Sequence, residues 1–298
     1  MVRKAVIPAA GYATRLFPWS KAVRKEMMPV LDSDGLVKPA IQLIVEEAVE
    51  SGIERVCIVT QRGDATFEDY FSPLSDEMEN TLREREWALE ASSKIEILGE
   101  KIDFVIQHKQ EGYGDAVLCA REWVGDEPFL LLLGDHLYRS IKETRCAKQL
   151  IDVHQRCRKS VSAVVRTLED RLRLYGTVAG ERVGREPVYR LREIVEKPDV
   201  NYARTHLRVE GLPEGEYLCF FGMHVLTPGI FSCISYHKEN KIYLRGEIQL
   251  TDAQEMLRAR EGHYAFEVEG RTYDFGNPEG VAETIVAFNK RWRERNRL

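Results

Sequence analysis

Short apolar runs alternate with a segment of helical periodicity near the start of the chain, and this alternation constrains the fold more than any other feature. Residues 5–10 form an apolar run that ends at Gly11, as expected of a buried strand. In residues 39–50 the apolar positions recur at helical spacing, and Gly52 marks the end of the helix. Residues 56–59 form a second apolar run. Strand, helix and strand at this spacing form a βαβ unit, which predicts a mostly parallel sheet.

The alternation resumes after residue 100 and predicts an α/β fold with a mixed central β-sheet flanked by helices. Residues 104–107 and 129–133 are predicted strands, and a helix rich in Ala, Val and Leu is predicted from Asp115. The second half has fewer helices between its strands, which favours a mixed sheet over a parallel one. The remaining predicted strands are 161–167, 175–179, 188–195 and 217–226, and the remaining helices are 148–157, 249–260 and 281–293.

Residues 64–100 interrupt the alternation. Glu and Arg dominate residues 76–90, where Met78, Leu82 and Leu89 form a narrow apolar stripe at helical spacing. This pattern is typical of a solvated helix that packs one thin face. We interpret the segment as a helical insert that lies over the sheet.

The last predicted helix has an apolar stripe that must pack against something, made of Val281, Ile285, Phe288 and Trp292. A contact with the core is favoured over an interface with a partner. No linker, internal repeat or low-complexity segment divides the sequence, and we therefore expect one domain over residues 1–298.

Composition and charge exclude several classes of protein. The formal net charge of −5 disfavours a general nucleic-acid binder, because such binding requires clustered Lys and Arg. No apolar run approaches the roughly 18 residues that a membrane helix needs, and no secretory signal is present. Six cysteines occur without a C-x-x-C pair, and seven histidines have no metal-ligand spacing. We expect a soluble cytoplasmic protein with reduced thiols and with histidines that are structural or lie on the surface.

The loop after the first strand is the strongest local signal for a ligand. Its sequence, Pro-Ala-Ala-Gly-Tyr-Ala-Thr-Arg over residues 8–15, has small residues that let backbone N–H groups approach an anion. Arg15 would add a planar cation to a bound phosphate. The alternative is a tight turn with an incidental arginine. Neither a Walker A motif nor a G-x-G-x-x-G motif is present, so neither P-loop hydrolysis nor NAD binding is indicated.

A series of motifs in a fixed order resembles the sugar-phosphate nucleotidylyltransferase family over nearly the whole chain. The motifs are the loop at residues 8–15, Arg-Lys-Glu-Met-Met-Pro-Val at 24–30, Gln107 with Glu-Gly-Tyr-Gly-Asp-Ala at 111–116, Leu-Gly-Asp at 133–135, Tyr-Gly at 175–176, Glu-Lys-Pro at 196–198, Gly-Glu-Ile-Gln-Leu-Thr-Asp at 246–252 and Tyr-Asp-Phe-Gly-Asn at 273–277. This resemblance implies a Rossmann-like nucleotidyltransferase fold. It also implies a nucleotide-binding half of about residues 1–140, a sugar-binding half of about 141–280 and a C-terminal helix at 281–296.

Within the family, the chain is most similar to the bacterial UTP–glucose-1-phosphate uridylyltransferases, which also have a charged helical insert. Three positions depart from the family pattern. Ala13 stands where a glycine is usual, Asp115 replaces a common histidine, and Gly-Asp-His at 134–136 replaces Pro-Asp-Val. The reaction class is unaffected by these departures. A thymidylyltransferase, another sugar-1-phosphate nucleotidylyltransferase and a catalytically silent regulatory homologue remain alternatives.

The resemblance implies roles for residues on the nucleotide side of the site. Arg15 and Lys25 are expected to neutralise the departing pyrophosphate, and Asp135 and Asp274 are expected to bind Mg²⁺. Asp135 follows an apolar strand, at the sheet edge where α/β proteins bind ligands, although a structural Asp that caps a following helix would fit the same place. Gln107 has the donor and acceptor that a pyrimidine edge requires. The remaining nucleotide-binding positions implied are Ala9, Ala10, Gly11 and Gly112.

On the sugar side, the resemblance implies that Lys197 binds the sugar phosphate and that Glu196 accepts hydrogen bonds from sugar hydroxyls. Gly176 and Gly222 are implied where the sugar approaches the backbone, although isolated glycines also mark turns. The implied substrates are UTP and glucose-1-phosphate, and the implied assembly is a dimer or tetramer. Arg15, Lys25, Asp135 and Lys197 are all present, which disfavours the silent homologue.

Overall fold

The computed structural model describes residues 1–244 and 246–296. Its thirteen named strands in this part of the chain are β1 Lys4–Pro8, β2 Pro29–Leu31, β3 Val37–Pro39, β4 Arg55–Gln61, β5 Ile102–Gln107, β6 Phe129–Leu132, β7 His136–Ser140, β8 Ser160–Leu168, β9 Gly176–Arg182, β10 Val188–Glu196, β11 Glu216–Leu226, β12 His263–Glu267 and β13 Gly270–Asp274. The helices are α1 Ala40–Val49, α2 Thr66–Phe71, α3 Asp76–Leu82, α4 Glu86–Gly99, α5 Tyr113–Cys119, α6 Arg121–Val124, α7 Cys146–Cys157, α8 Val200–His206, α9 Gly229–Glu239, α10 Leu250–Glu261 and α11 Pro278–Asn296.

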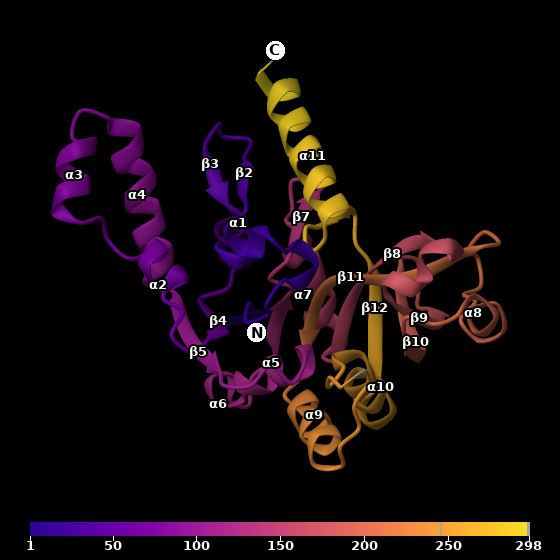
Figure 1. Ribbon diagram of the computed structural model, residues 1–298. Helices are drawn as coiled ribbons and strands as arrows, with labels where there is room; N and C mark the ends of the chain where they lie inside the picture. The colour runs from indigo at the N-terminus through magenta and orange to yellow at the C-terminus, as the bar shows by residue number, and fades with distance from the viewer. Residues whose placement is uncertain (245, 297–298) are drawn as a thin grey trace.

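A mixed sheet of nine strands in the order β5-β4-β1-β6-β11-β8-β12-β10-β9 forms the centre of the molecule (Figure 1). Strands β5, β4, β1 and β6 are parallel to one another, as the βαβ pattern predicts. Strand β11 pairs antiparallel with β6 and joins these strands to those of the second half. Strand β9 pairs with both β10 and β11, so the second half of the sheet curls back on itself.

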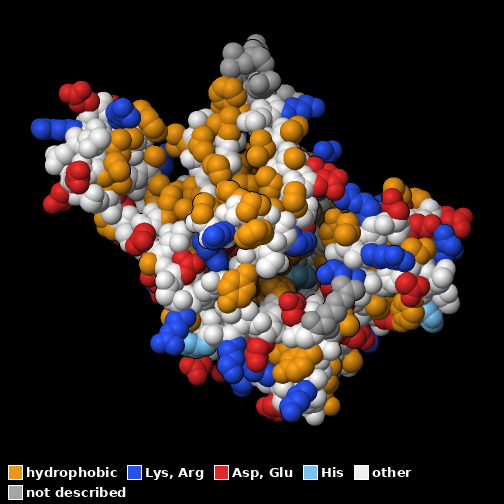
Figure 2. Space-filling model, viewed as in Figure 1, with side chains coloured by type: hydrophobic (Ala, Val, Ile, Leu, Met, Phe, Trp, Pro, Cys, Tyr) orange, Lys and Arg blue, Asp and Glu red, His pale blue; other side chains and the backbone are white. Residues whose placement is uncertain are grey.

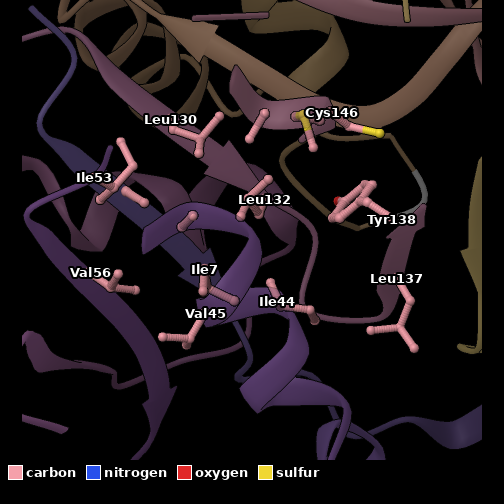
Figure 3. Packing of buried hydrophobic residues seen from close by; sticks show 14 of the residues in the cluster. Ile7, Ile44, Val45, Ile53, Val56, Leu130, Leu132, Leu137, Tyr138 and Cys146 are labelled. Atoms are coloured by element: carbon pink, nitrogen blue, oxygen red, sulfur yellow. The ribbon is translucent and has the colours of Figure 1, made fainter. Parts of the chain in front are cut away.

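Helices cover both faces of the sheet because side chains alternate between its two faces. Ile7 of β1 packs with Ile44 and Val45 of α1 in one cluster, as Figure 3 shows. The neighbouring Val6 faces the other way, into a second cluster that includes Ile230 of α9. Complete burial of each such aliphatic side chain contributes about 1.5–3 kcal/mol, so the helices on both faces hold the central strand β1 in place.

The segment at 64–100 does not lie over the sheet, which corrects the sequence-based expectation. It forms α2, α3 and α4, and α3 and α4 stand away from the body of the molecule (Figure 1). Helix α3 ends at Leu82 and α4 begins at Glu86, so the predicted stripe of Met78, Leu82 and Leu89 is divided between two helices. Phe71 and Leu98 are buried at the base of this arm, whereas Trp87 remains 60% exposed.

Helix α11 contacts the core, as predicted, and Phe288 and Val281 of the predicted stripe pack there, whereas Ile285 does not. Phe288 is buried against Tyr273, with the ring centroids 5.7 Å apart, and Thr284 is fully buried. Ile285 is 41% exposed, because it lies one position away from the row formed by Thr284 and Phe288. Figure 2 shows hydrophobic side chains gathered on the surface beside this helix and the β2–β3 hairpin, where Val286 is also exposed.

All six cysteines are free thiols in the structure. In the part of the chain that the structure describes, no helix is both long enough and apolar enough to cross a bilayer.

Candidate active site

A cavity of about 600 Å³ lies at the carboxyl ends of the parallel strands β1, β5 and β6. Strands β9, β10 and β11 contribute its opposite wall. Open α/β sheets bind ligands at this edge, because the loops there diverge and leave backbone groups unpaired. The predicted site residues that line this cavity are Ala10, Gly11, Arg15, Lys25, Gln107, Gly112, Asp135, Gly176, Glu196, Lys197, Gly222 and Asp274.

Ala9 is the predicted site residue that lies outside the cavity lining. Its N–H donates to the Val59 carbonyl at 2.8 Å, and its carbonyl accepts from the Arg24 guanidinium. Both backbone groups of Ala9 therefore extend the sheet and anchor Arg24, which leaves the next residues, Ala10 and Gly11, to face a ligand.

Ala13 adopts the left-handed conformation, with φ of 51°. A glycine would enter this conformation without steric cost, and an alanine does so at some strain. The resemblance implies a glycine at this position, and the alanine here adopts a conformation that favours glycine. A short 3₁₀ turn follows at Thr14–Leu16 and carries Arg15 to the cavity wall.

Lys25 and Asp135, which both line the cavity, form an ion pair with Nζ 2.8 Å from Oδ2. His136 Nδ1 lies 2.9 Å from the other carboxylate oxygen of Asp135. Burial alone would raise the pKa of Asp135, but Lys25 and His136 outweigh it and hold the pKa well below its usual range. Burial likewise opposes the charged form of Lys25, yet Asp135 and Glu26 raise its pKa above the ordinary value. Both groups are therefore charged near neutral pH.

Glu26 is fully buried beside this pair, and neither of its carboxylate oxygens has a hydrogen-bond partner. Its oxygens lie 3.7 Å from the Arg24 guanidinium and 3.8 Å from the Lys25 ammonium. Burial raises the pKa of Glu26 to about 7, despite the opposing effect of the two cations. A buried carboxyl group that titrates near neutrality thus lies directly beside Arg24 and Lys25.

Asp274 reaches Asp135 through the small two-stranded sheet of β7 and β13, where Asp274 pairs with His136. The ligand atoms of Asp135, His136 and Asp274 lie within 4.8 Å of one another. Gly276 allows this convergence: a Cβ there would lie 2.7 Å from Asp135 Oδ2 and 2.9 Å from the Arg15 guanidinium. His136, which the sequence did not single out, contributes one of these three atoms and lines the cavity. The residue after Asp135 begins strand β7, so Asp135 does not cap a helix.

The predicted sugar side of the cavity lies at the end of β10. Thr251 donates a hydrogen bond to Glu196 Oε2 at 2.7 Å, and the Lys197 ammonium lies 3.2 Å from Glu196 Oε1. Consecutive strand residues normally face opposite ways. Here the strand ends at Glu196, and Lys197 has a positive φ of 46°, which explains how both side chains line one cavity.

Gly176 and Gly222 allow close packing in the cavity wall. A Cβ on Gly176 would lie 2.6 Å from the ring of Phe220. Gly222 has φ of 89°, and a Cβ there would lie 2.7 Å from Leu133 and 2.9 Å from His136. Side chains at either position would need their neighbours to move, so both glycines shape the cavity wall.

The two residues predicted to contact the base, Gln107 at the end of β5 and Gly112, line another part of the cavity. Gly112 has φ of 111°, and a Cβ there would lie 2.8 Å from the backbone nitrogen of Ile248. The amide nitrogen of Gln107 donates to Asp115 Oδ2 at 2.8 Å. Four residues that the sequence did not assign to the site contact the predicted ones: Asp115, Thr251, His136 and Glu26. All four lie within or beside the motifs, but apolar periodicity gives no signal for such polar contacts.

Similarity to known proteins shows the family of this chain. A nucleotidyl transferase family model matches residues 4–291. The chain belongs to the nucleotidyl transferase family. Curated relatives include UTP–glucose-1-phosphate uridylyltransferase of Bacillus subtilis (strain 168), which is 38% identical over 96% of this chain and 91% of that protein. Uridylyltransferase 2 of Staphylococcus saprophyticus is also 38% identical, over 96% and 92%.

Solved structures of this nucleotidyl transferase family share the fold. An apo UDP-glucose pyrophosphorylase covers 100% of both chains at 34% identity with a TM-score of 0.83. A UTP-bound enzyme from Acinetobacter baumannii covers 97% of this chain and 93% of that one, at 31% identity and a TM-score of 0.79. The predicted Rossmann-like nucleotidyltransferase fold is therefore confirmed.

Proposed function

We propose that this nucleotidyl transferase is a UTP–glucose-1-phosphate uridylyltransferase, which makes UDP-glucose and pyrophosphate. The proposal rests on one observation: two clusters of charged side chains line the same cavity. One cluster contains Arg15, Lys25 and Asp135, and the other contains Glu196 and Lys197. Relatives of that name are 38% identical, and similar structures are described with UTP and with UDP-glucose. Arg15, Lys25, Asp135 and Lys197, the four charged residues expected in an active enzyme, are all present, which also argues against a silent homologue.

The reaction is an in-line displacement at the α-phosphorus of UTP. A phosphate oxygen of glucose-1-phosphate forms a new bond to that phosphorus, and the bond to the bridging oxygen of the β-phosphate breaks. The electron pair leaves with pyrophosphate. Because the attacking oxygen is already an anion, no general base is needed, and catalysis depends on positioning and charge stabilisation.

The cationic side chains of the cavity would act on different phosphates in this reaction. Lys25, fixed by Asp135 at 2.8 Å, and Arg15 would stabilise the negative charge that accumulates on the leaving phosphates. Lys197 would hold the phosphate of the sugar substrate in line with the α-phosphorus. Glu196, itself anchored by Thr251, would accept hydrogen bonds from sugar hydroxyls. Gly176 and Gly222 would allow the sugar to approach the backbone.

The nucleotide would contact the opposite end of the cavity. Backbone groups of Ala10 and Gly11 would bind the triphosphate, as short loops of small residues do. Gln107 and Gly112 would contact the uracil ring. Ala9 would act on this loop through the sheet and through Arg24 and would not touch the nucleotide.

Asp135 and Asp274 suit Mg²⁺, which takes oxygen ligands and usually only one or two from protein. Each carboxylate oxygen of Asp135 has one partner in the structure, so lone pairs remain for a metal. A bound Mg²⁺ would supply positive charge to the triphosphate. We further propose a homo-oligomer, a dimer or tetramer, and a cytoplasmic location, the latter supported by the six free thiols.

Pyrophosphate release with glucose-1-phosphate and Mg²⁺, measured in parallel with UTP, dTTP, CTP, ATP and GTP, tests the proposal. Strong release with UTP alone is expected. A preference for dTTP would identify a thymidylyltransferase instead. If no triphosphate supports release, a panel of other sugar-1-phosphates separates a different sugar specificity from a silent homologue.

A further inference from the structure

Gln107 is held at the cavity wall by a hydrogen bond that defines which end of its amide is free. The side chain is only 3% exposed, and its amide nitrogen donates to Asp115 Oδ2 at 2.8 Å. The same nitrogen lies 3.4 Å from the Gly112 carbonyl oxygen. Both of its hydrogens therefore have acceptors within the protein. The group that Gln107 has left for a ligand in the cavity is its carbonyl oxygen, Oε1.

Asp115 in turn is held from the other side. The Lys238 ammonium of α9 lies 2.5 Å from Asp115 Oδ1 and 2.9 Å from Glu111 Oε2. A carboxylate paired with a lysine only accepts hydrogen bonds. It therefore faces the nitrogen of a neighbouring amide and never its oxygen. The chain from Lys238 through Asp115 to Gln107 defines the orientation of the amide without ambiguity.

We propose that Asp115 is a positioning residue for base selection, because it keeps the carbonyl oxygen of Gln107 available to accept a hydrogen bond from a base N3–H. Uracil carries this hydrogen, whereas N3 of cytosine is an acceptor and would meet the Gln107 oxygen with like polarity. The inference rests on the proposed uridylyltransferase function. It also assigns a purpose to Asp115, one of the positions where the sequence departs from its family.

The substitution Asp115→Asn tests the orientation directly. Lys238 would hold the oxygen of the new amide, whose nitrogen would then face Gln107. The Gln107 amide would have to turn, offering its nitrogen to the cavity. Adding Lys238→Met frees the new amide to present its oxygen to Gln107 again. Lys238→Met alone leaves Asp115 in place and should change base preference little.

The experiment measures kcat and KM for UTP and for CTP, and the equilibrium binding of each by calorimetry, in the wild type and these variants. In Asp115→Asn the ratio of kcat/KM for UTP to that for CTP should fall about tenfold or more, mainly through KM, since one hydrogen bond is reversed. The double variant should recover part of the ratio. A purely structural role would not produce this rescue. Asp103→Asn is the matched control. Asp103 is a carboxylate on β5, the strand that carries Gln107, and it accepts a hydrogen bond from Trp123 outside the cavity.

An unchanged UTP to CTP ratio in folded Asp115→Asn would overturn the inference. Should that variant fail to fold, Asp115→Ala releases the Gln107 amide to rotate, and the same ratio must then shrink or the inference is wrong. If the wild type binds UTP in preference to CTP but does not release pyrophosphate, the proposed function fails, and the binding ratios still decide the role of Asp115. Equal binding of UTP and CTP by the wild type would overturn the inference itself.

Discussion

The Lys25 ammonium lies 2.8 Å from Oδ2 of Asp135, although 110 positions separate the two residues in the sequence. The contact joins the loop after β1 to the loop after β6, and these are neighbouring parallel strands. The pair forms the charged centre of the proposed phosphate site, and the buried Glu26 lies behind it.

We expect Lys25→Met to lower turnover on the order of a hundredfold to a thousandfold, because a preorganised cation at the leaving phosphates is lost. Asp135→Asn should have a comparable effect. The double variant should lose less than the product of the two single effects, because the residues contact each other. Steady-state pyrophosphate release measures all three, and fully multiplicative losses would show that the pair does not act as a unit.

Lys197→Ala should raise KM for glucose-1-phosphate and lower kcat, while KM for UTP changes little, because Lys197 lies on the sugar side. Alanine also replaces a residue with positive φ there, so backbone strain needs a control. Arg158→Ala is suitable, because Arg158 is an exposed cation with φ of 55° outside the cavity lining. A near-wild-type rate in Lys197→Ala would remove the assignment.

Gly222→Ala should destabilise the fold more than Gly184→Ala does. Both glycines have positive φ, and that strain costs about 1–3 kcal/mol at either site. At Gly184 a Cβ would meet nothing within 4 Å, whereas at Gly222 it would lie 2.7 Å from Leu133. Overpacking there adds about 1–3 kcal/mol. Urea denaturation of the two variants gives the difference, and equal midpoints would contradict the close approach.

Glu26 should make the stability of the protein depend on pH. Burial raises its pKa from 4.5 to about 7, so the native protein binds more protons than the unfolded chain between these values. The contribution of Glu26 is therefore fully present below pH 4.5 and is lost as the pH rises to 7, by as much as about 3 kcal/mol. The free energy of unfolding of the wild type minus that of Glu26→Gln should fall across this window. A pH-independent difference would mean that Glu26 is ionised throughout.

Asp274→Asn should raise the Mg²⁺ concentration needed for half-maximal activity, since one oxygen ligand loses its charge. Chelation with EDTA should abolish wild-type activity, and added Mg²⁺ should restore it. Asp170→Asn, at an exposed position outside the cavity lining, is the control and should leave the Mg²⁺ titration unchanged. If Asp274→Asn gives the same titration as the control, the metal is held without Asp274.

Local sequence determined the elements and the ligand loop of this protein. The apolar run before Gly11, the helical spacing in residues 39–50 and the apolar strand before Asp135 each follow from which side chains can be buried at a given backbone period. Consequently α1, β1 and β6 occur where they were predicted, with small shifts at their ends. The charged candidates Arg15, Lys25 and Lys197 were also identified from motifs that are contiguous in the chain.

Tertiary structure alone decided which of these groups meet. The pairing of β7 with β13 brings Asp274 to His136, and the packing of α5 against α9 brings Lys238 to Asp115. No local period reports such contacts, because they depend on long-range sheet pairing and on helix packing. The arm of α3 and α4 failed as a prediction for the same reason: a thin apolar stripe indicates that a helix packs somewhere, but only the rest of the fold determines against what. The sequence thus specified the chemical groups, and the three-dimensional fold specified their partners.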